Sequence, residues 1–194
     1  MDEGYIKYNC EWIRGAPPPV DVVDALNLGR NLLRERGLLG ITEDGIGFGN
    51  ISVRGAGREF IISGSATGGI ERATPGHYTY VTDYDIDRNF VRCRGPIRAS
   101  SEAMTHAAIY AATPGCGAVA HGHSPELWEK LINRAQATPE LAEFGTPELA
   151  REVMRIALTA EFAESGVIVL AGHPEGIITI GPTPYEAARR MAES

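Results

Sequence analysis

The stretch Gly117-Ala-Val-Ala-His-Gly-His-Ser124 joins a run of small apolar residues to two histidines. The apolar run is typical of a buried strand, and His121 and His123 stand at its end. Side chains two positions apart on a strand point to the same face, so both imidazoles can bind one metal ion. Two histidines do not complete a zinc site, and only His173 sits comparably, directly after the apolar run 166–172.

Hydrophobic patterning on both sides of this strand predicts a layered α/β domain. Before the strand we expect a helix that Asp21 caps and that stops at Gly37, followed by an antiparallel meander of strands at 51–53, 59–62, 78–82 and 90–93. Around and after it we expect helices at 100–110, 125–132 and 146–162, two strands flanking His173, and a last helix from about Pro184.

The bulk composition is that of one ordinary globular domain. The chain has 194 residues, of which 43% are hydrophobic and 22% charged, and we treat residues 1–20 as an N-terminal extension of this domain. The net charge of −7 argues against nucleic acid or an anionic membrane as the main partner, because like charges repel. A small-molecule ligand is therefore expected.

Cysteine and lysine usage indicate the compartment and the chemistry. Cys10, Cys93 and Cys116 are widely spaced and form no CxxC motif, which favours reduced thiols in the cytoplasm. The acidic N-terminus and the lack of a long apolar run predict neither a signal peptide nor a membrane span. Lys7 and Lys130 are the only lysines, so chemistry on a carbonyl compound would rely on a metal rather than on a Schiff base.

Three segments rich in small residues are candidate anion sites. They are Gly45-Ile-Gly-Phe-Gly-Asn50, Ile62-Ser-Gly-Ser-Ala-Thr-Gly-Gly69 and Ala99-Ser-Ser-Glu-Ala103. Backbone N–H groups in such loops and at a helix N-terminus can approach phosphate oxygens. Each segment also has an ordinary interpretation, as a tight turn, a mobile surface loop and a helix cap in which Glu102 complements the dipole. None has the spacing of a dinucleotide fingerprint or a P-loop.

Taken together, these pieces resemble the class II aldolase/adducin family, of the fuculose-phosphate aldolase type, from about Val22 to Met191. The matching segments, in order, are Gly49-Asn-Ile-Ser-Val-Arg54, Ser63-Gly-Ser-Ala-Thr-Gly68, Ser100-Ser-Glu102 with His106, Ala118-Val-Ala-His-Gly-His-Ser124 and Val167-Ile-Val-Leu-Ala-Gly-His173. The resemblance implies a three-layer αβα fold whose mixed, mostly antiparallel central sheet is covered by helices on both faces.

The resemblance also implies roles for individual residues. His121, His123 and His173 would bind zinc or another divalent transition metal, and Glu102 would act as the catalytic base. The residues implied in binding the substrate phosphate are Gly49, Asn50, Ser63, Gly64, Ser100 and Ser101, with Ser65 as an alternative to Ser63.

The implied reaction is reversible cleavage of a small ketose phosphate to dihydroxyacetone phosphate and an aldehyde, through a metal-stabilised enediolate. A glutamate at position 102 favours this over the epimerase branch of the family, which typically carries aspartate there. A sugar-phosphate epimerase or dehydratase stays an alternative, as does a non-catalytic adducin-like interaction module. The resemblance suggests a homotetramer. No tyrosine lies between Tyr110 and Tyr185, and the chain ends soon after the last predicted helix, so the aldehyde-side residues of many relatives are not recognised here.

Other metal folds fit the sequence less well. Gly115 and the later histidine pair imitate a first cupin motif, but Glu126 and Glu129 miss its glutamate spacing and the predicted helices do not suit a jelly roll. Pro125 and Glu126 stand where a metallo-β-lactamase pattern needs Asp and His. His106, one turn beyond Glu102, either orients that carboxylate or is simply a hydrogen-bonded helix histidine.

Overall fold

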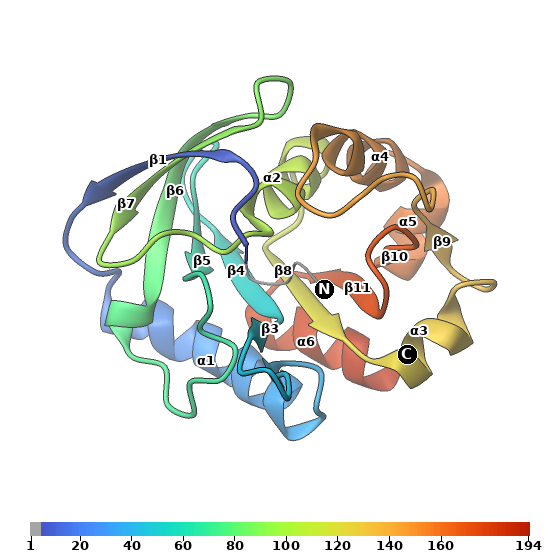
Figure 1. Cartoon of the computed structure of the whole chain (residues 1–194), viewed down its shortest axis with the longest axis horizontal. Helices are drawn as coiled ribbons and strands as arrows, with labels where there is room; N and C mark the ends of the chain where they lie inside the picture. Colours follow the sequence, from blue (N-terminus) through green and yellow to red (C-terminus); the bar gives the residue numbers. More distant parts are fainter. Residues whose placement is uncertain (1–4) are drawn as a thin grey trace.

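A computed structural model describes residues 5–194 and contains a nine-stranded sheet with helices on both faces (Figure 1). Only the outermost pairs, β1 with β7 and β9 with β10, are parallel, so the sheet is mixed and mostly antiparallel as predicted. In spatial order the strands are β1 Asn9–Arg14, β7 Phe90–Gly95, β6 Tyr78–Asp85, β5 Phe60–Ser63, β4 Asn50–Arg54, β8 Ala118–His123, β11 Gly176–Gly181, β10 Val167–Val169 and β9 Gln136–Ala137. A separate short hairpin pairs β2 (Gly40–Ile41) with β3 (Gly47–Phe48).

The helices form the two outer layers. Helices α1 (Val20–Glu35) and α6 (Pro184–Glu193) pack together on one face, and α2 (Ala103–Ala112) and α4 (Pro147–Ala157) pack together on the other (Figure 1). Each pair lies over its own cluster of buried apolar side chains. The short helices α3 (Pro125–Leu131) and α5 (Ala160–Ser165) and the 3-10 turn Pro75–His77 complete the chain. The predicted three-layer αβα architecture is therefore confirmed.

Strand β8 lies near the middle of the sheet, and all six of its residues are buried. Its side chains alternate between the two cores: Ala118 and Ala120 belong to the core under α1 and α6, and Val119 belongs to the core under α2 and α4. His121 and His123 continue the face of Val119. The residue between them must be small, because a Cβ on Gly122 would lie 2.7 Å from the carbonyl oxygen of Leu38.

Three local features differ from the sequence prediction. The predicted helix 146–162 is two helices, because the Thr159 hydroxyl accepts a hydrogen bond from the Phe162 N–H (3.2 Å) and starts α5 afresh. Helix α1 begins at Val20 with Pro19 in the cap position, so Asp21 lies in the first turn and is not the cap. Strand β1 was not predicted, and it forms one edge of the sheet.

Among residues 5–194, none of the helices combines the length and the apolar character that crossing a membrane requires.

Candidate active site

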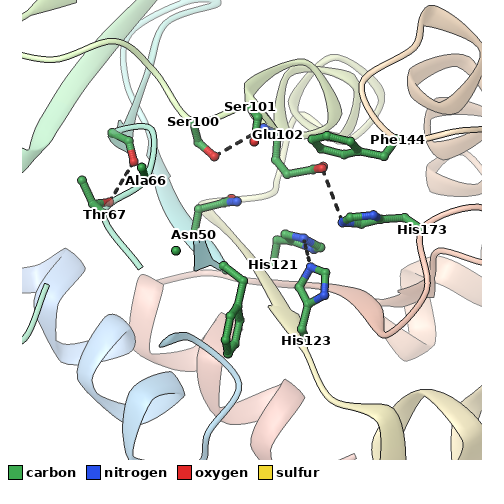
Figure 2. A pocket seen from close by; sticks show the side chains of 14 residues that line it. Asn50, Ala66, Thr67, Ser100, Ser101, Glu102, His121, His123, Phe144 and His173 are labelled. Atoms are coloured by element: carbon green, nitrogen blue, oxygen red, sulfur yellow. Dashed lines mark hydrogen bonds and ion pairs between the residues drawn. The ribbon is translucent and has the colours of Figure 1, made fainter. Parts of the chain in front are cut away.

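One cavity brings together all the predicted site residues except Ser63 (Figure 2). It lies where β3 leads into β4, beside the end of β8, the N-terminus of α2, and the turn between β10 and β11. Its lining consists of Gly47, Phe48, Gly49, Asn50, Gly64, Ala66, Thr67, Ser100, Ser101, Glu102, His121, His123, Phe144 and His173. Segments from both halves of the sequence thus meet at one site.

The three predicted metal ligands converge at one end of this cavity. Nitrogen atoms of His121, His123 and His173 lie within 4.8 Å of one another, and the Nε2 atoms of His121 and His123 are 3.0 Å apart. Nδ1 of His121 is 3.1 Å from the carbonyl oxygen of Ile177. Because a carbonyl can only accept, Nδ1 carries the proton, and Nε2 of the neutral ring presents its lone pair to the cluster.

Burial keeps these imidazoles neutral. Desolvation lowers the pKa of His121 to about 4 and that of His173 to about 3, and it also lowers the pKa of His123, since there the charged ring would lose its hydration. Only the neutral ring can bind a metal ion. Two nitrogens bound to one tetrahedral zinc ion lie about 3.3 Å apart. The spacing, tautomer and protonation of the cluster therefore fit a divalent metal.

Glu102 reaches the same end of the cavity from the start of α2. Its side chain is buried, and Oε1 lies 3.9 Å from Nε2 of His173 (Figure 2). The ring of Phe144 stacks against the imidazole of His173 with 4.7 Å between the centroids. A carboxylate held beside three neutral imidazoles can complete a cation site or move a proton next to it.

The opposite end of the cavity is built from small and hydroxyl-bearing residues. Ser100 and Ser101 precede α2 and face the loop that carries Ala66 and Thr67, with Asn50 between this end and the histidines (Figure 2). In place of the expected helix caps, Glu102 occupies the cap position, and Ser100 Oγ accepts a hydrogen bond from its N–H (3.3 Å). A helix N-terminus and hydroxyl donors together favour an anionic group.

Ser63, one of the predicted phosphate ligands, does not line this cavity. It lies on β5, where its hydroxyl accepts a hydrogen bond from the Ile51 N–H on β4 (3.1 Å). Neither Ser63 nor the alternative Ser65 lines the cavity, whereas Thr67 from the same loop does. Thr67 belongs to the same predicted motif, residues 63–68. The sequence predicted a strand over 59–62, whereas β5 continues through Ser63.

Glycines hold this wall together by conformation and by close packing. Gly49, before β4, has φ +76°, a value that side chains disfavour. A Cβ on Gly68 would lie 2.4 Å from the carbonyl oxygens of Gly40 and Phe48, so the loop that contains Gly68 packs directly on the β2–β3 hairpin. The predicted small-residue segments 45–50 and 62–69 therefore pack directly against each other.

His106 belongs to a buried network behind the cavity. Its Nδ1 is 2.7 Å from Ser52 Oγ, which is 2.8 Å from the Tyr110 hydroxyl. Desolvation lowers the pKa of His106 well below its ordinary value, so the ring is neutral. Nε2 of His106 is buried and makes no hydrogen bond within the described residues. The Nδ1 contact supports the second interpretation of His106, a hydrogen-bonded helix histidine.

Comparisons with known proteins agree with this architecture. Residues 32–194 match the family model for the Class II Aldolase and Adducin N-terminal domain. No curated protein is similar enough in sequence to count as a match. A solved L-fuculose 1-phosphate aldolase shares the fold with a TM-score of 0.67 at 20% identity, over 91% of this chain and 82% of that one.

Two other solved structures show the same fold. One is YgbL from Klebsiella pneumoniae, described as a candidate aldolase/epimerase/decarboxylase, with a TM-score of 0.62 at 16% identity over 88% of this chain and 83% of that one. The other is the N-terminal class II aldolase domain of a conserved protein from Thermoplasma acidophilum, with a TM-score of 0.57 at 18% identity over 92% of each chain. With the family match spanning most of the sequence, this chain belongs to the class II aldolase and adducin N-terminal domain family.

Proposed function

We propose that this protein is a zinc-dependent aldolase that reversibly cleaves a small ketose phosphate to dihydroxyacetone phosphate and an aldehyde. One observation carries the proposal: Glu102 and three neutral imidazoles meet at one end of a cavity whose other end is lined with hydroxyls and a helix N-terminus. A substrate with a carbonyl at one end and a phosphate at the other matches this division. Family membership supports the same class of reaction.

His121, His123 and His173 would hold the metal ion in this proposal. When bound, such an ion supplies a Lewis acid that polarises the substrate carbonyl. Glu102 takes a proton from the carbon beside the carbonyl in the condensation direction and returns it in the cleavage direction. Its burial excludes water that would compete for that proton.

The other end of the cavity would orient the substrate. Ser100, Ser101, Asn50 and Thr67 would donate hydrogen bonds to the phosphate, and Gly49 and Gly64 would let it approach the backbone. The Ser101 hydroxyl makes no hydrogen bond within the described part of the chain, so it is available to such a ligand. Holding the phosphate fixes the reacting carbons relative to Glu102, which contributes to the rate through orientation.

A substrate screen tests the reaction. Zinc-loaded protein is incubated with phosphorylated ketoses, and with dihydroxyacetone phosphate plus aldehydes, while NMR follows cleavage and epimerisation together. Cleavage products support the aldolase. A new diastereomer without cleavage would identify an epimerase, and loss of water would identify a dehydratase, either of which replaces the proposal.

A metal assay separates an enzyme from a non-catalytic adducin-like module. Purified protein is dialysed against zinc or another divalent transition metal, and bound metal is measured per chain. About one ion per chain supports the enzyme, because three convergent imidazoles form one site. No bound metal, and no uptake, would favour the interaction module. A homotetramer and a cytoplasmic location stay predictions.

A further inference from the structure

Arg30 is a buried cation directly behind the small-residue loop of the cavity. It lies in α1 and is 1% exposed. Its Nη2 donates hydrogen bonds to the carbonyl oxygens of Thr67 (2.9 Å), Gly68 (3.4 Å) and Ile70. Arg34, one turn later, adds a hydrogen bond from Nη1 to the Gly68 oxygen (3.1 Å). Two arginines of α1 thus donate hydrogen bonds to the same short stretch of backbone, residues 67–70.

A guanidinium this deep in a protein normally faces a carboxylate. Within residues 5–194, Arg30 forms no ion pair, and backbone carbonyls alone accept its hydrogen bonds. Arg30 itself does not line the cavity, whereas Ala66 and Thr67 do, so the loop lies between the guanidinium and the cavity. The positive charge of Arg30 therefore lies behind the loop that lines the proposed phosphate-binding end of the cavity.

The hydrogen bonds to Arg30 also set the direction of the peptide groups. In a planar trans peptide the C=O and the following N–H point in opposite directions. Carbonyls of Thr67 and Gly68 that face Arg30 therefore turn the N–H groups of Gly68 and Gly69 away from it. Those N–H groups, and those of Ala66 and Thr67, have no acceptor within the described residues.

The loop needs an external restraint to keep this shape. Ala66 has φ +58°, a left-handed conformation that costs energy for any residue with a Cβ. Such a conformation persists when its surroundings impose it. The arginine contacts, together with the close packing of Gly68, supply that restraint.

We infer that Arg30 is a positioning residue for the anion-binding end of the cavity: by fixing the carbonyls of residues 67–70 it holds the loop in the shape that accepts a phosphate group. This inference rests on the proposed function for the identity of the anion. The loop shape itself is a property of the protein without ligand, so it can be measured separately.

Arg54 provides a matched control. Its guanidinium also donates to three backbone carbonyls, those of Tyr110 (3.0 Å), Thr113 (2.7 Å) and Cys116 (2.6 Å). These carbonyls belong to the end of α2 and the turn after it, and neither they nor Arg54 line the cavity. Removing Arg54 therefore costs a similar set of hydrogen bonds without touching the loop.

The test compares full-length wild type with Arg30→Met, Arg30→Lys, Arg34→Gln and Arg54→Met. Calorimetry measures the binding of inorganic phosphate, metal analysis measures zinc per chain, and hydrogen exchange follows residues 63–70 in the free protein. We expect Arg30→Met to weaken phosphate binding about tenfold and to speed exchange in the loop, with zinc retained. Arg30→Lys restores part of the affinity, and Arg34→Gln, which removes one hydrogen bond, loses about threefold. Arg54→Met stays within about twofold of wild type.

Other outcomes overturn the inference. It is wrong if Arg30→Met and Arg34→Gln bind phosphate like wild type, or if Arg54→Met loses as much affinity as Arg30→Met. If Arg30→Met does not fold, Arg30→Lys and Arg34→Gln decide the question by the same comparison. If wild type binds no phosphate, the phosphate part of the proposed function fails, and the loop exchange decides alone: unchanged exchange rejects the positioning role and faster exchange supports it.

Discussion

Oε1 of Glu102 lies 3.9 Å from Nε2 of His173, so the proposed base and a proposed metal ligand share one buried corner of the cavity. A carboxylate in such a place is stabilised by a nearby positive charge. The three imidazoles are neutral, because burial lowers their pKa values. A cation held by the histidines would therefore stabilise the ionised form of Glu102, which is the form that can act as a base.

Replacing Glu102 by Gln should stop the chemistry and leave the metal in place. The amide keeps the size of the side chain but cannot accept a proton, so substrate proton exchange and cleavage should fall at least about 100-fold. NMR measures both rates, and metal analysis measures the bound ion. Glu35→Gln, at an exposed position of α1, is the control and should behave like wild type. Wild-type rates in Glu102→Gln with metal retained would remove Glu102 from the mechanism.

Replacing His173 by Ala should release the metal. The site would lose one of three convergent nitrogens, and we expect affinity to fall at least about 100-fold, since even changes to residues behind a ligand cost up to that much. A competition titration with a chelating dye measures the change. His77→Ala is the control, because His77 lies in the 3-10 turn and does not line the cavity. Equal affinity in the two variants would contradict the assignment of His173.

The parts of the site that were predictable are those encoded by short-range pattern. The alternation of a strand places His121 and His123 on one face whatever the rest of the fold does. The small-residue segments could be recognised because glycines mark positions of close approach, as Gly68 shows. The layered fold followed from strands interleaved with helices.

What was missed depends on distant contacts. Ser63 was predicted to bind the phosphate, with Ser65 as the alternative, because the hydrogen bond of its hydroxyl to β4 is invisible in the segment itself. Strand β1 pairs in parallel with β7, whose sequence lies far away, and the polar–apolar alternation within Asn9–Arg14 spans only its first four residues. Arg30 looked like an ordinary helix residue, and only the folded chain places it against the loop at 67–70.

The metal-free protein should lose stability as the pH falls below neutrality. In the folded state the pKa is about 4 for His121 and about 3 for His173, whereas an unfolded histidine titrates near 6.5. Between these values the unfolded chain binds more protons, so the unfolding free energy falls with decreasing pH. Each such histidine contributes about 1.4 kcal/mol per pH unit in that window. Urea unfolding at pH 7, 6 and 5 measures the slope, and His121→Ala should reduce it. A flat profile would show that the rings are not held neutral.

Tyr8 connects the unpredicted N-terminal segment to the cavity. It lies just before β1, is 5% exposed, and its hydroxyl donates to the carbonyl oxygens of Ala99 (3.1 Å) and Ser100 (3.0 Å). Burial raises the pKa of Tyr8, so the hydroxyl keeps its proton and remains a donor. The segment therefore braces the turn that presents Ser100, although it lies outside the region that matches the family model.

Replacing Tyr8 by Phe should weaken both stability and the anion site. The ring keeps its packing, but the turn at Ser100 loses its hydroxyl donor, which should cost about 1 kcal/mol of unfolding free energy. Phosphate binding should weaken as well, because Ser100 lines the cavity. Tyr5→Phe is the matched control, since Tyr5 is 75% exposed and should be neutral in both measurements. If Tyr8→Phe loses stability but binds phosphate like wild type, the segment supports the fold alone. If neither property changes, the contact to Ser100 does not restrain the turn.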